Sequence, residues 1–166
     1  MNLAEAAAKA DALAEAGAEQ ELATLRTQWD DDLEMAARSA DYRERAAAYR
    51  AIAQFRFRQK LELLRRGLED ESPACRGSAL LSLEALSRDH PGVINGLRAL
   101  LHDLADRDGN DAVRRLAIVA LRNGSGDRAT IAILTSLAAN DEQSKDLRDA
   151  ASKVAQILRR KSGPAR

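Results

Sequence analysis

Carboxylate clusters are the first candidates for metal chemistry in this sequence, because hard cations such as Ca²⁺ bind carboxylate oxygens. Residues 30–32 are three consecutive aspartates, but consecutive residues of a helix point about 100° apart, so the three side chains cannot all face one ion. Residues 106–109 read Asp-Arg-Asp-Gly. If this glycine is the invariant glycine of an EF-hand loop, Leu104 and Arg115 stand where the first and the last ligand belong. We therefore predict no metal site at either cluster.

The two histidines and the single cysteine do not form a recognisable catalytic or zinc-binding set. His90 precedes a proline and His102 lies in a helical segment, so neither has the paired spacing of a helical zinc site. Cys75 stands on an apolar stripe, which favours a buried, unreactive thiol over a nucleophile. Residues 124–126 read Gly-Ser-Gly but lack the Lys-Ser/Thr end of a phosphate-binding loop. We predict that the protein is not an enzyme, with no catalytic residue, cofactor or metal.

The composition indicates an all-α protein. Aromatic residues are 3% of the chain, while alanine and leucine, both strong helix formers, carry most of the apolar content. The formal net charge is zero, so the molecule as a whole has no general attraction to nucleic acid or to anionic membranes. Residues 1–40 hold nine acids and three bases, whereas residues 41–66 hold eight bases and three acids. We expect these two segments to pack against each other.

No targeting or membrane segment is apparent. The N-terminal residues have neither the cationic stretch nor the apolar stretch of a signal peptide. No apolar run approaches the length of about 18 residues that is typical of a membrane helix. A lone cysteine excludes an intramolecular disulfide. We expect a cytoplasmic protein with no membrane partner.

The strongest pattern in the chain is an arginine that recurs with the same neighbours. Arg76, Arg114 and Arg148 are 38 and 34 residues apart. The residue before each arginine is apolar and an alanine follows three positions later, which gives two further sets: Cys75, Val113 and Leu147, then Ala79, Ala117 and Ala151. An array of helix pairs produces such self-similarity, because one pair cannot bury its apolar face without a neighbour.

The recurrent arginine is expected to have a structural role. It stands in the first turn of the second helix of each pair, where its planar fork can reach carboxylates or carbonyls of the preceding turn. Those turns contain Asp70, Asp108 and Asp141. A row of ligand-binding arginines is the alternative.

Apolar periodicity and capping residues predict the helices that carry this pattern. The helical segments are 2–16, 18–38, 41–69, 73–87, 93–105, 111–122, 128–139 and a last helix that ends near Lys161. Asp41, Asp111 and Asp127 are the expected N-caps. Trp29 is expected to anchor its helix in the core, and residues 123–126 to form a mobile turn.

Two interpretations of residues 41–69 compete. Residues 41–66 contain no Gly or Pro. Because the residues that usually form turns are missing, we favour one long helix with a kink. Against this, Arg43 and Ala46 repeat the pattern of Arg76 and Ala79 at a distance of 33 residues. That repetition favours two helices.

The repeated residues, best represented by Val113 and Arg114, resemble HEAT repeats, particularly the short bacterial HEAT-like kind that also occurs in phycobilin lyases. The resemblance implies an α-solenoid of antiparallel helix pairs, and we predict an N-terminal helical hairpin packed on it. Residues 1–71 would form that hairpin, or an atypical capping repeat. Residues 72–161 would form the HEAT-like repeats, and residues 162–166 a disordered tail.

A solenoid of this kind suits a non-catalytic scaffold or adaptor, because the core fixes its curvature while exposed positions remain free to vary. The expected partner is another protein, which nothing in the sequence identifies. Exposed positions on the second helices are the candidate contacts: Arg115, Arg122, Lys145, Asp149 and Lys153. Formation of a homo-oligomer through the alanine-rich first helix stays open.

The alternative is a nucleic-acid-binding repeat protein that uses a basic helix, residues 43–66. Arg58, Arg65 and Arg66 would share one face of that helix and contact phosphates, with Phe55 at the edge for base stacking. Glu62 lies four residues from Arg58 and from Arg66 and would neutralise them in pairs. We therefore rank this function second.

Overall fold

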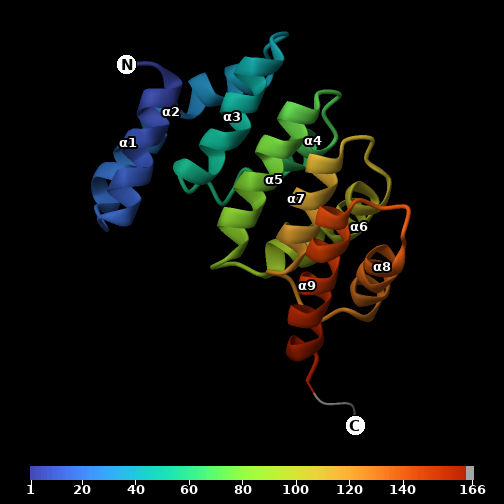
Figure 1. Cartoon of the computed structure of the whole chain (residues 1–166). Coiled ribbons are helices and arrows are strands. Elements are labelled where there is room, and N and C mark those ends of the chain that lie inside the picture. Colours follow the sequence, from blue (N-terminus) through green and yellow to red (C-terminus); the bar gives the residue numbers. More distant parts are fainter. Residues whose placement is uncertain (164–166) are drawn as a thin grey trace. The chain divides into compact units, whose positions relative to one another are not determined.

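The computed structural model describes residues 1–163, and every regular element within them is a helix (Figure 1). In chain order the helices are α1 (Leu3–Glu15), α2 (Glu19–Ala37), α3 (Tyr42–Gln54), α4 (Leu61–Leu68), α5 (Pro73–Ser87), α6 (Gly92–Arg107), α7 (Asp111–Leu121), α8 (Arg128–Ala139) and α9 (Lys145–Lys161). The predicted all-α class, built from helix pairs, is confirmed.

Side-chain caps explain where several helices begin. The Asp41 side chain accepts a hydrogen bond from the backbone N–H of Arg43, and Asp127 caps α8 in the same way, as predicted. The cap of α7 is Asn110, whose side chain accepts from the N–H of Val113. We expected Asp111 to be the N-cap, but it is the first helical residue. There its negative charge interacts favourably with the positive end of the helix dipole.

Residues 41–69 form two helices, so the favoured single long helix is wrong. Helix α3 ends at Gln54 and α4 begins at Leu61. Between them Arg56 has a φ of 57°, a left-handed conformation that reverses the chain without glycine. Phe55 and Phe57 on either side are fully buried, with ring centroids 5.4 Å apart. Burial of both rings stabilises a turn that no Gly or Pro marks in the sequence.

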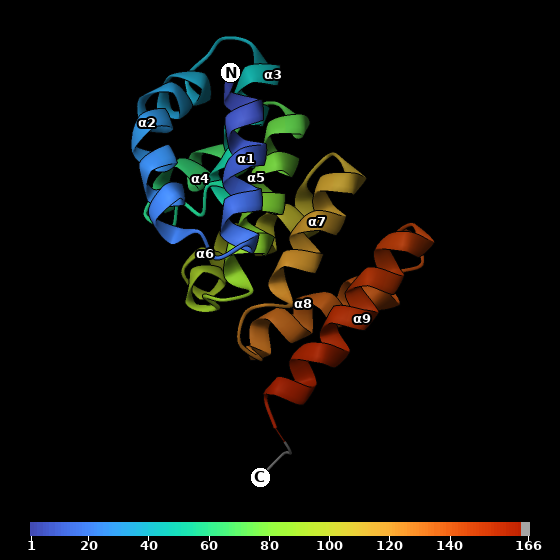
Figure 2. The same ribbon diagram turned by 90° about the vertical axis from the view of Figure 1, so that its left-hand side faces the viewer.

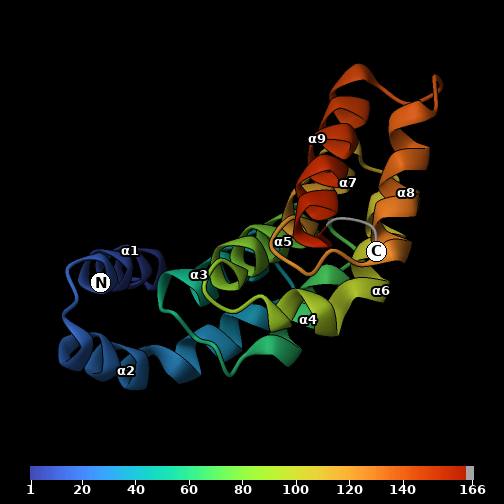
Figure 3. The ribbon, with the colours of Figure 1, turned by 90° about the horizontal axis from the view of Figure 1, so that it is seen from below.

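The chain forms two compact units, and the first comprises Met1–Leu86. Helices α1 and α2 pack side by side (Figure 2), and α3 contacts α1, α2 and α4. Figure 3 shows α1, α3 and α5 in one layer, with α2 and α4 in a second layer beneath it. Leucine and isoleucine side chains fill the space between the layers, including Leu22, Leu33, Ile52, Leu64 and Leu83.

The segregated charges of the first unit pack together, as predicted. In the turn after α3, Arg56 Nη1 lies 2.7 Å from Asp11 Oδ1 of α1. Lys60 Nζ lies 2.6 Å from Asp30 and 2.7 Å from Glu34, both on α2. Burial lowers the pKa of Lys60, but the hydrogen bonds to these two carboxylates outweigh that effect, so its pKa is raised. Acidic helices thus hold the basic turn in place.

Trp29 occupies a less central place than expected. Leu22, Leu25 and Leu33 of α2 are buried, whereas Trp29 is only half-buried. Its indole Nε1 is buried and has no hydrogen-bond partner within residues 1–163. The aliphatic residues of α2 therefore form the buried stripe, and the indole lies at its edge.

The second unit begins at Ser87 and contains α6 to α9. Helices α6 and α7 form one pair and α8 and α9 another, while α7 contacts α9 and α6 contacts α8. The first helices and the second helices of the two pairs thus make separate layers. Ile94, Leu101, Ile118, Leu134 and Leu158 are among the fully buried side chains of this core.

The turn after α7 is held by hydrogen bonds, contrary to the expected mobile turn. Arg98 Nη2 donates to Ser125 Oγ over 2.7 Å, and Lys161 Nζ donates to the Gly124 carbonyl over 3.0 Å. A Cβ on Gly124 would lie 2.6 Å from Ile94 Cγ2, so the turn also packs closely on α6. These contacts fix the Gly-Ser-Gly segment against two helices.

Two further predictions concern the C-terminal tail and the absence of a membrane helix. Ser162 is the C-cap of α9, and the rest of the predicted disordered tail from residue 164 lies outside the described residues. Among the described helices, none has the length and apolarity needed to span a membrane.

Candidate protein-binding surface

The recurrent arginines make the structural contacts that the sequence predicted. Arg76 Nη1 donates to the carbonyls of Asp70 and Glu71, over 2.9 and 3.1 Å. Arg148 Nη1 lies 3.7 Å from Asp141 Oδ1. Both arginines therefore bind the turn that precedes their own helix.

Arg114 is the most buried member of this set. Its Nε donates to the Ala105 carbonyl at the end of α6, over 3.0 Å, and its Nη1 donates to Gln143 Oε1, over 2.8 Å. One guanidinium thus connects α6, α7 and the turn before α9. These arginines hold the repeats together, which supports the structural interpretation over a ligand-binding row.

Arg45 belongs to the same set, and sequence reasoning missed it. Its Nη1 donates to the carbonyls of Ser39 and Ala40, six and five residues earlier, the same offsets that Arg76 uses. Its Nε and Nη2 donate to the two carboxylate oxygens of Asp70, over 2.9 and 3.0 Å. The Arg45 and Asp70 side chains are only 13% and 8% exposed.

The charges of this pair stabilise each other. The hydrogen bond to Asp70 raises the pKa of Arg45. Burial raises the pKa of Asp70, but hydrogen bonds from Arg45 and from the Ser72 backbone N–H outweigh burial, so the pKa of Asp70 is lowered. Both groups are therefore held ionised at neutral pH.

The position of Arg45 corrects the register proposed for α3. A shift of 31 residues aligns Arg45 with Arg76, Ala48 with Ala79 and Ile52 with Leu83; both alanines and both aliphatic residues are fully buried. The shift of 33 residues pairs Arg43 with Arg76, but Arg43 is exposed. Two observations thus distinguish the shift of 31 residues from the shift of 33: both aligned alanines are buried, and both aligned arginines bind backbone carbonyls. The sequence pattern alone could not distinguish the two shifts.

The predicted partner-binding residues lie on the second helices of the second unit. Arg115 is on α7, and Lys145, Asp149 and Lys153 are on α9; all four are exposed. Arg122 is the C-cap of α7 and is half-buried, and its carbonyl accepts a hydrogen bond from Lys161. Because α7 contacts α9, the five residues belong to one pair of neighbouring helices.

The basic residues of the alternative site do not share a helix face. Arg65 and Arg66 lie exposed on α4, whereas Arg58 lies in the turn before it. Phe55, the proposed stacking residue, is fully buried. The predicted continuous basic helix is therefore not formed, although the three arginines are all exposed.

Cys75 and His102 occupy structural positions. Cys75 is fully buried, as predicted; its Sγ donates to the Tyr42 carbonyl over 3.2 Å, and burial raises the pKa of its thiol. His102 Nε2 lies 2.7 Å from Thr130 Oγ1, and burial lowers the pKa of the imidazole. Both contacts join neighbouring helices.

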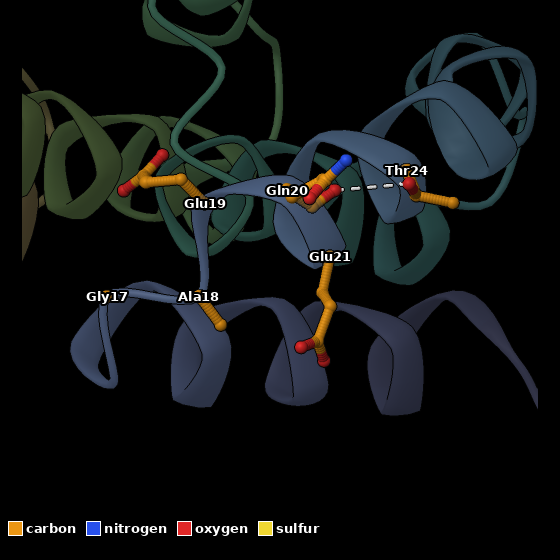
Figure 4. A pocket seen from close by; sticks show the side chains of 6 residues that line it. All are labelled: Gly17, Ala18, Glu19, Gln20, Glu21 and Thr24. Atoms are coloured by element: carbon orange, nitrogen blue, oxygen red, sulfur yellow. Dashed lines mark hydrogen bonds between the residues drawn. The ribbon is translucent and has the colours of Figure 1, made fainter.

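A pocket at the turn between α1 and α2 offers no convergent chemistry. It is lined by Gly17, Ala18, Glu19, Gln20, Glu21 and Thr24 (Figure 4). The carboxylates of Glu19 and Glu21 point in different directions, and Thr24 Oγ1 donates to the Gln20 carbonyl over 3.1 Å. Nowhere in residues 1–163 do three His, Cys, Asp or Glu side chains gather as a metal site would require.

Comparison with known proteins identifies the repeats. Residues 33–108 match the family model of HEAT repeats, a span that runs from the C-terminal part of α2 past the end of α6. No curated protein and no solved structure matched the chain. The matched segment is therefore similar to HEAT repeats, and every regular element within it is a helix.

Proposed function

We propose that the protein is a non-catalytic scaffold or adaptor that binds another protein through exposed residues of its second helices. HEAT repeats commonly serve as protein-interaction scaffolds. The observation that carries the proposal is the division of α7 and α9 into two faces. Val113 and Ala117 on α7, with Leu147 and Ala151 on α9, are buried, while charged side chains occupy the opposite side.

The charged side chains of this face suit recognition of a partner. Arg115, Lys145 and Lys153 are cationic and Asp149 is anionic, so a partner must present the complementary order of signs. Such complementarity contributes more to specificity and association rate than to affinity. Because none of these side chains supports the core, they can specify a partner without altering the fold.

Affinity purification of the tagged protein from its native cell, with and without nuclease, tests the proposal. We expect one protein in near-stoichiometric yield in both samples. The Arg115→Glu/Lys153→Glu variant should lose that protein. Arg107→Glu is a matched control, because Arg107 is exposed on the first helix α6. Equal recovery by all three proteins would contradict the proposed face.

Binding of nucleic acid is the second candidate function, supported by the exposure of Arg58, Arg65 and Arg66. None of the three makes an ion pair with a residue of the described chain. A binder of this kind should lose affinity steeply as salt rises. Fluorescence anisotropy with a 20-nucleotide single strand, using wild type and the triple glutamate variant, measures this; a salt-independent signal would exclude it.

Two further proposals concern context. We propose a cytoplasmic location, which suits a free, buried thiol at Cys75. We also propose that two copies of the chain can associate through α1. Multi-angle light scattering across a range of concentrations decides whether the chain is a monomer.

A further inference from the structure

The exposed side of α3 and α5 forms a second surface that no prediction identified. We call it the α3–α5 surface; it comprises Arg43, Ala46, Ala47 and Arg50 on α3, and Ala74, Gly77, Ser78 and Leu81 on α5, all exposed or half-buried. Both helices belong to the first unit and to the segment that matches HEAT repeats.

Hydrogen bonds hold the two helices together along this surface. At one end Cys75 Sγ donates to the Tyr42 carbonyl, over 3.2 Å. Two turns further along, Ser82 Oγ bonds to the Tyr49 carbonyl and lies 3.2 Å from the Arg50 carbonyl. The backbone of Arg50 therefore lies against Ser82 of α5, and Leu81 is the residue before Ser82.

The charge of the α3–α5 surface has one sign. Arg43 and Arg50 are seven residues apart, which places them on one side of α3 with about 10 Å of helix axis between them. Arg50 makes no ion pair with any residue in the described range. Glu44 lies roughly 120° around the helix from Arg50, and Glu84, the next acid on α5, is buried. Arg50 thus faces solvent without an acidic partner, whereas the Arg43 guanidinium lies 5.6 Å from the centroid of the Tyr42 ring, with Asp41 nearby.

An apolar strip accompanies these arginines. Leu81 is 38% exposed and Tyr42, beside Arg43, is 45% exposed, and both are among the few large apolar side chains exposed in residues 1–163. Ala46, Gly77 and Ser78 between them are small, so the backbone of another chain can approach closely. The surface therefore combines two cations with contact area for one or two apolar side chains.

We propose that the α3–α5 surface binds a protein segment in which acidic residues flank an apolar residue. Arg43 and Arg50 would each bind a carboxylate of the segment, because a guanidinium group donates paired, charge-assisted hydrogen bonds to the two carboxylate oxygens. The apolar residue would cover Leu81. A nucleic acid fits this surface less well, because a phosphate backbone gains nothing from the apolar strip and needs a longer row of cations. This inference rests on the proposed scaffold function and adds a second surface to it.

A selection without a presumed partner tests the inference. A phage library of random 16-residue peptides is selected on the wild-type protein and counter-selected on the Arg43→Glu/Arg50→Glu variant. We expect enriched peptides to contain more Asp and Glu than the starting library, next to Leu, Ile, Phe or Met. The most enriched peptide, synthesised and measured by fluorescence polarisation, should bind Arg50→Glu and Leu81→Glu at least tenfold more weakly than wild type.

Arg115→Glu, on α7, is the matched control and should bind the peptide as wild type does. Circular dichroism establishes that each variant is folded. No enrichment, enrichment without acidic residues, or equal binding by Arg50→Glu would overturn the inference. Loss of single-stranded DNA binding in the same variant would assign the surface to nucleic acid instead, and loss of a wild-type dimer would assign it to a second copy. None of these results affects the affinity purification that tests the proposed function.

Discussion

At the scale of single residues, the Arg45–Asp70 ion pair links two neighbouring helices of the first unit. Asp70 accepts two hydrogen bonds from Arg45 and one from the Ser72 backbone N–H. In the same turn, the backbone carbonyls of Asp70 and Glu71 accept hydrogen bonds from Arg76. One aspartate therefore connects the N-terminal turn of α3 to that of α5.

Replacement of Asp70 by alanine should strongly destabilise the protein. The change leaves the Arg45 guanidinium, whose side chain is 13% exposed, beside carbonyls without its counter-ion, so the unfolding free energy should fall. Urea denaturation followed by circular dichroism measures it. Arg43→Ala, an exposed change on the same helix, is the control and should leave the transition in place. An Asp70→Ala transition that coincides with wild type would show that the pair contributes little.

His102 should make stability depend on pH in mildly acidic solution. Burial lowers its pKa; nearby Asp127 raises it and Arg98 lowers it further. In the unfolded chain the pKa is about 6.5, so below that pH the unfolded state binds more protons than the folded state. The stability is complete above the unfolded pKa and declines as pH falls from there toward the folded pKa.

The comparison of wild type with His102→Gln between pH 7.5 and pH 5 isolates this effect. We expect the unfolding free energy of wild type to fall across that range more than that of the variant. The variant retains a side chain that can donate to Thr130 Oγ1, so packing and the hydrogen bond are approximately matched. Parallel pH profiles for the two proteins would show that His102 does not carry the effect.

At the scale of elements, close helix contact depends on Gly67 in α4. A Cβ at this position would lie 2.8 Å from Ala79 Cβ of α5 and 2.9 Å from Tyr49 Cδ1 of α3. Gly67→Ala should therefore destabilise the protein by about 1–3 kcal/mol through overpacking. Gly96→Ala on α6 is the control, because a Cβ there meets nothing within 4 Å; helix propensity should make it stabilising by about 0.5–1 kcal/mol. Thermal unfolding of both variants against wild type checks the opposite signs.

The break between α3 and α4 shows why element boundaries were harder to predict than element type. The left-handed Arg56 is held by hydrogen bonds from its Nη1 to the Ala53 carbonyl and to Asp11 Oδ1, each 2.7 Å. Arg26 Nε donates to the Phe55 carbonyl over 2.6 Å. Asp11 and Arg26 belong to α1 and α2, so part of what holds this turn cannot be read from residues 55–60 alone.

The equivalence of α3 and α5 bears on where the repeats begin. Sequence reasoning places the boundary at residue 72, with a hairpin before it, and that division stays a prediction. The family match from residue 33 and the shared contacts of Arg45 and Arg76 support an earlier start, with α2 and α3 as a repeat. Under that interpretation α1 would be the additional helix.

At the scale of the whole molecule, the two compact units should respond separately to local damage. In a repeat array, stability is approximately a sum of repeat and nearest-neighbour contributions. Trp29 is the only tryptophan and belongs to the first unit, so its fluorescence reports on that unit, whereas circular dichroism at 222 nm reports on all helices.

Two buried leucines allow a direct test. Leu64→Ala in α4 and Leu158→Ala in α9 each remove a fully buried side chain, at a cost of about 2–5 kcal/mol. We expect Leu64→Ala to move the Trp29 transition to lower urea, and Leu158→Ala to move the circular dichroism transition more than the Trp29 transition. Equal shifts of both probes in both variants would indicate that the whole chain unfolds as one unit.

The sequence by itself determined the helical class, the repeat and the structural use of Arg76, Arg114 and Arg148. These properties follow from local chemistry: helix propensity, apolar periodicity and, for Arg76 and Arg148, the reach of an arginine to the turn before its own helix. The burial of Cys75 and the packing of acidic helices on the basic turn were predictable for the same reason.

Only the tertiary structure decided the remaining features. The left-handed turn at Arg56, the register of α3 and the role of Arg45 each depend on partners distant in sequence, such as Asp11 and Asp70. The α3–α5 surface likewise exists because two helices 31 residues apart are joined by hydrogen bonds from Cys75 and Ser82 to carbonyls of α3. A linear pattern states which residues are polar or apolar, but which of them share a surface depends on long-range packing.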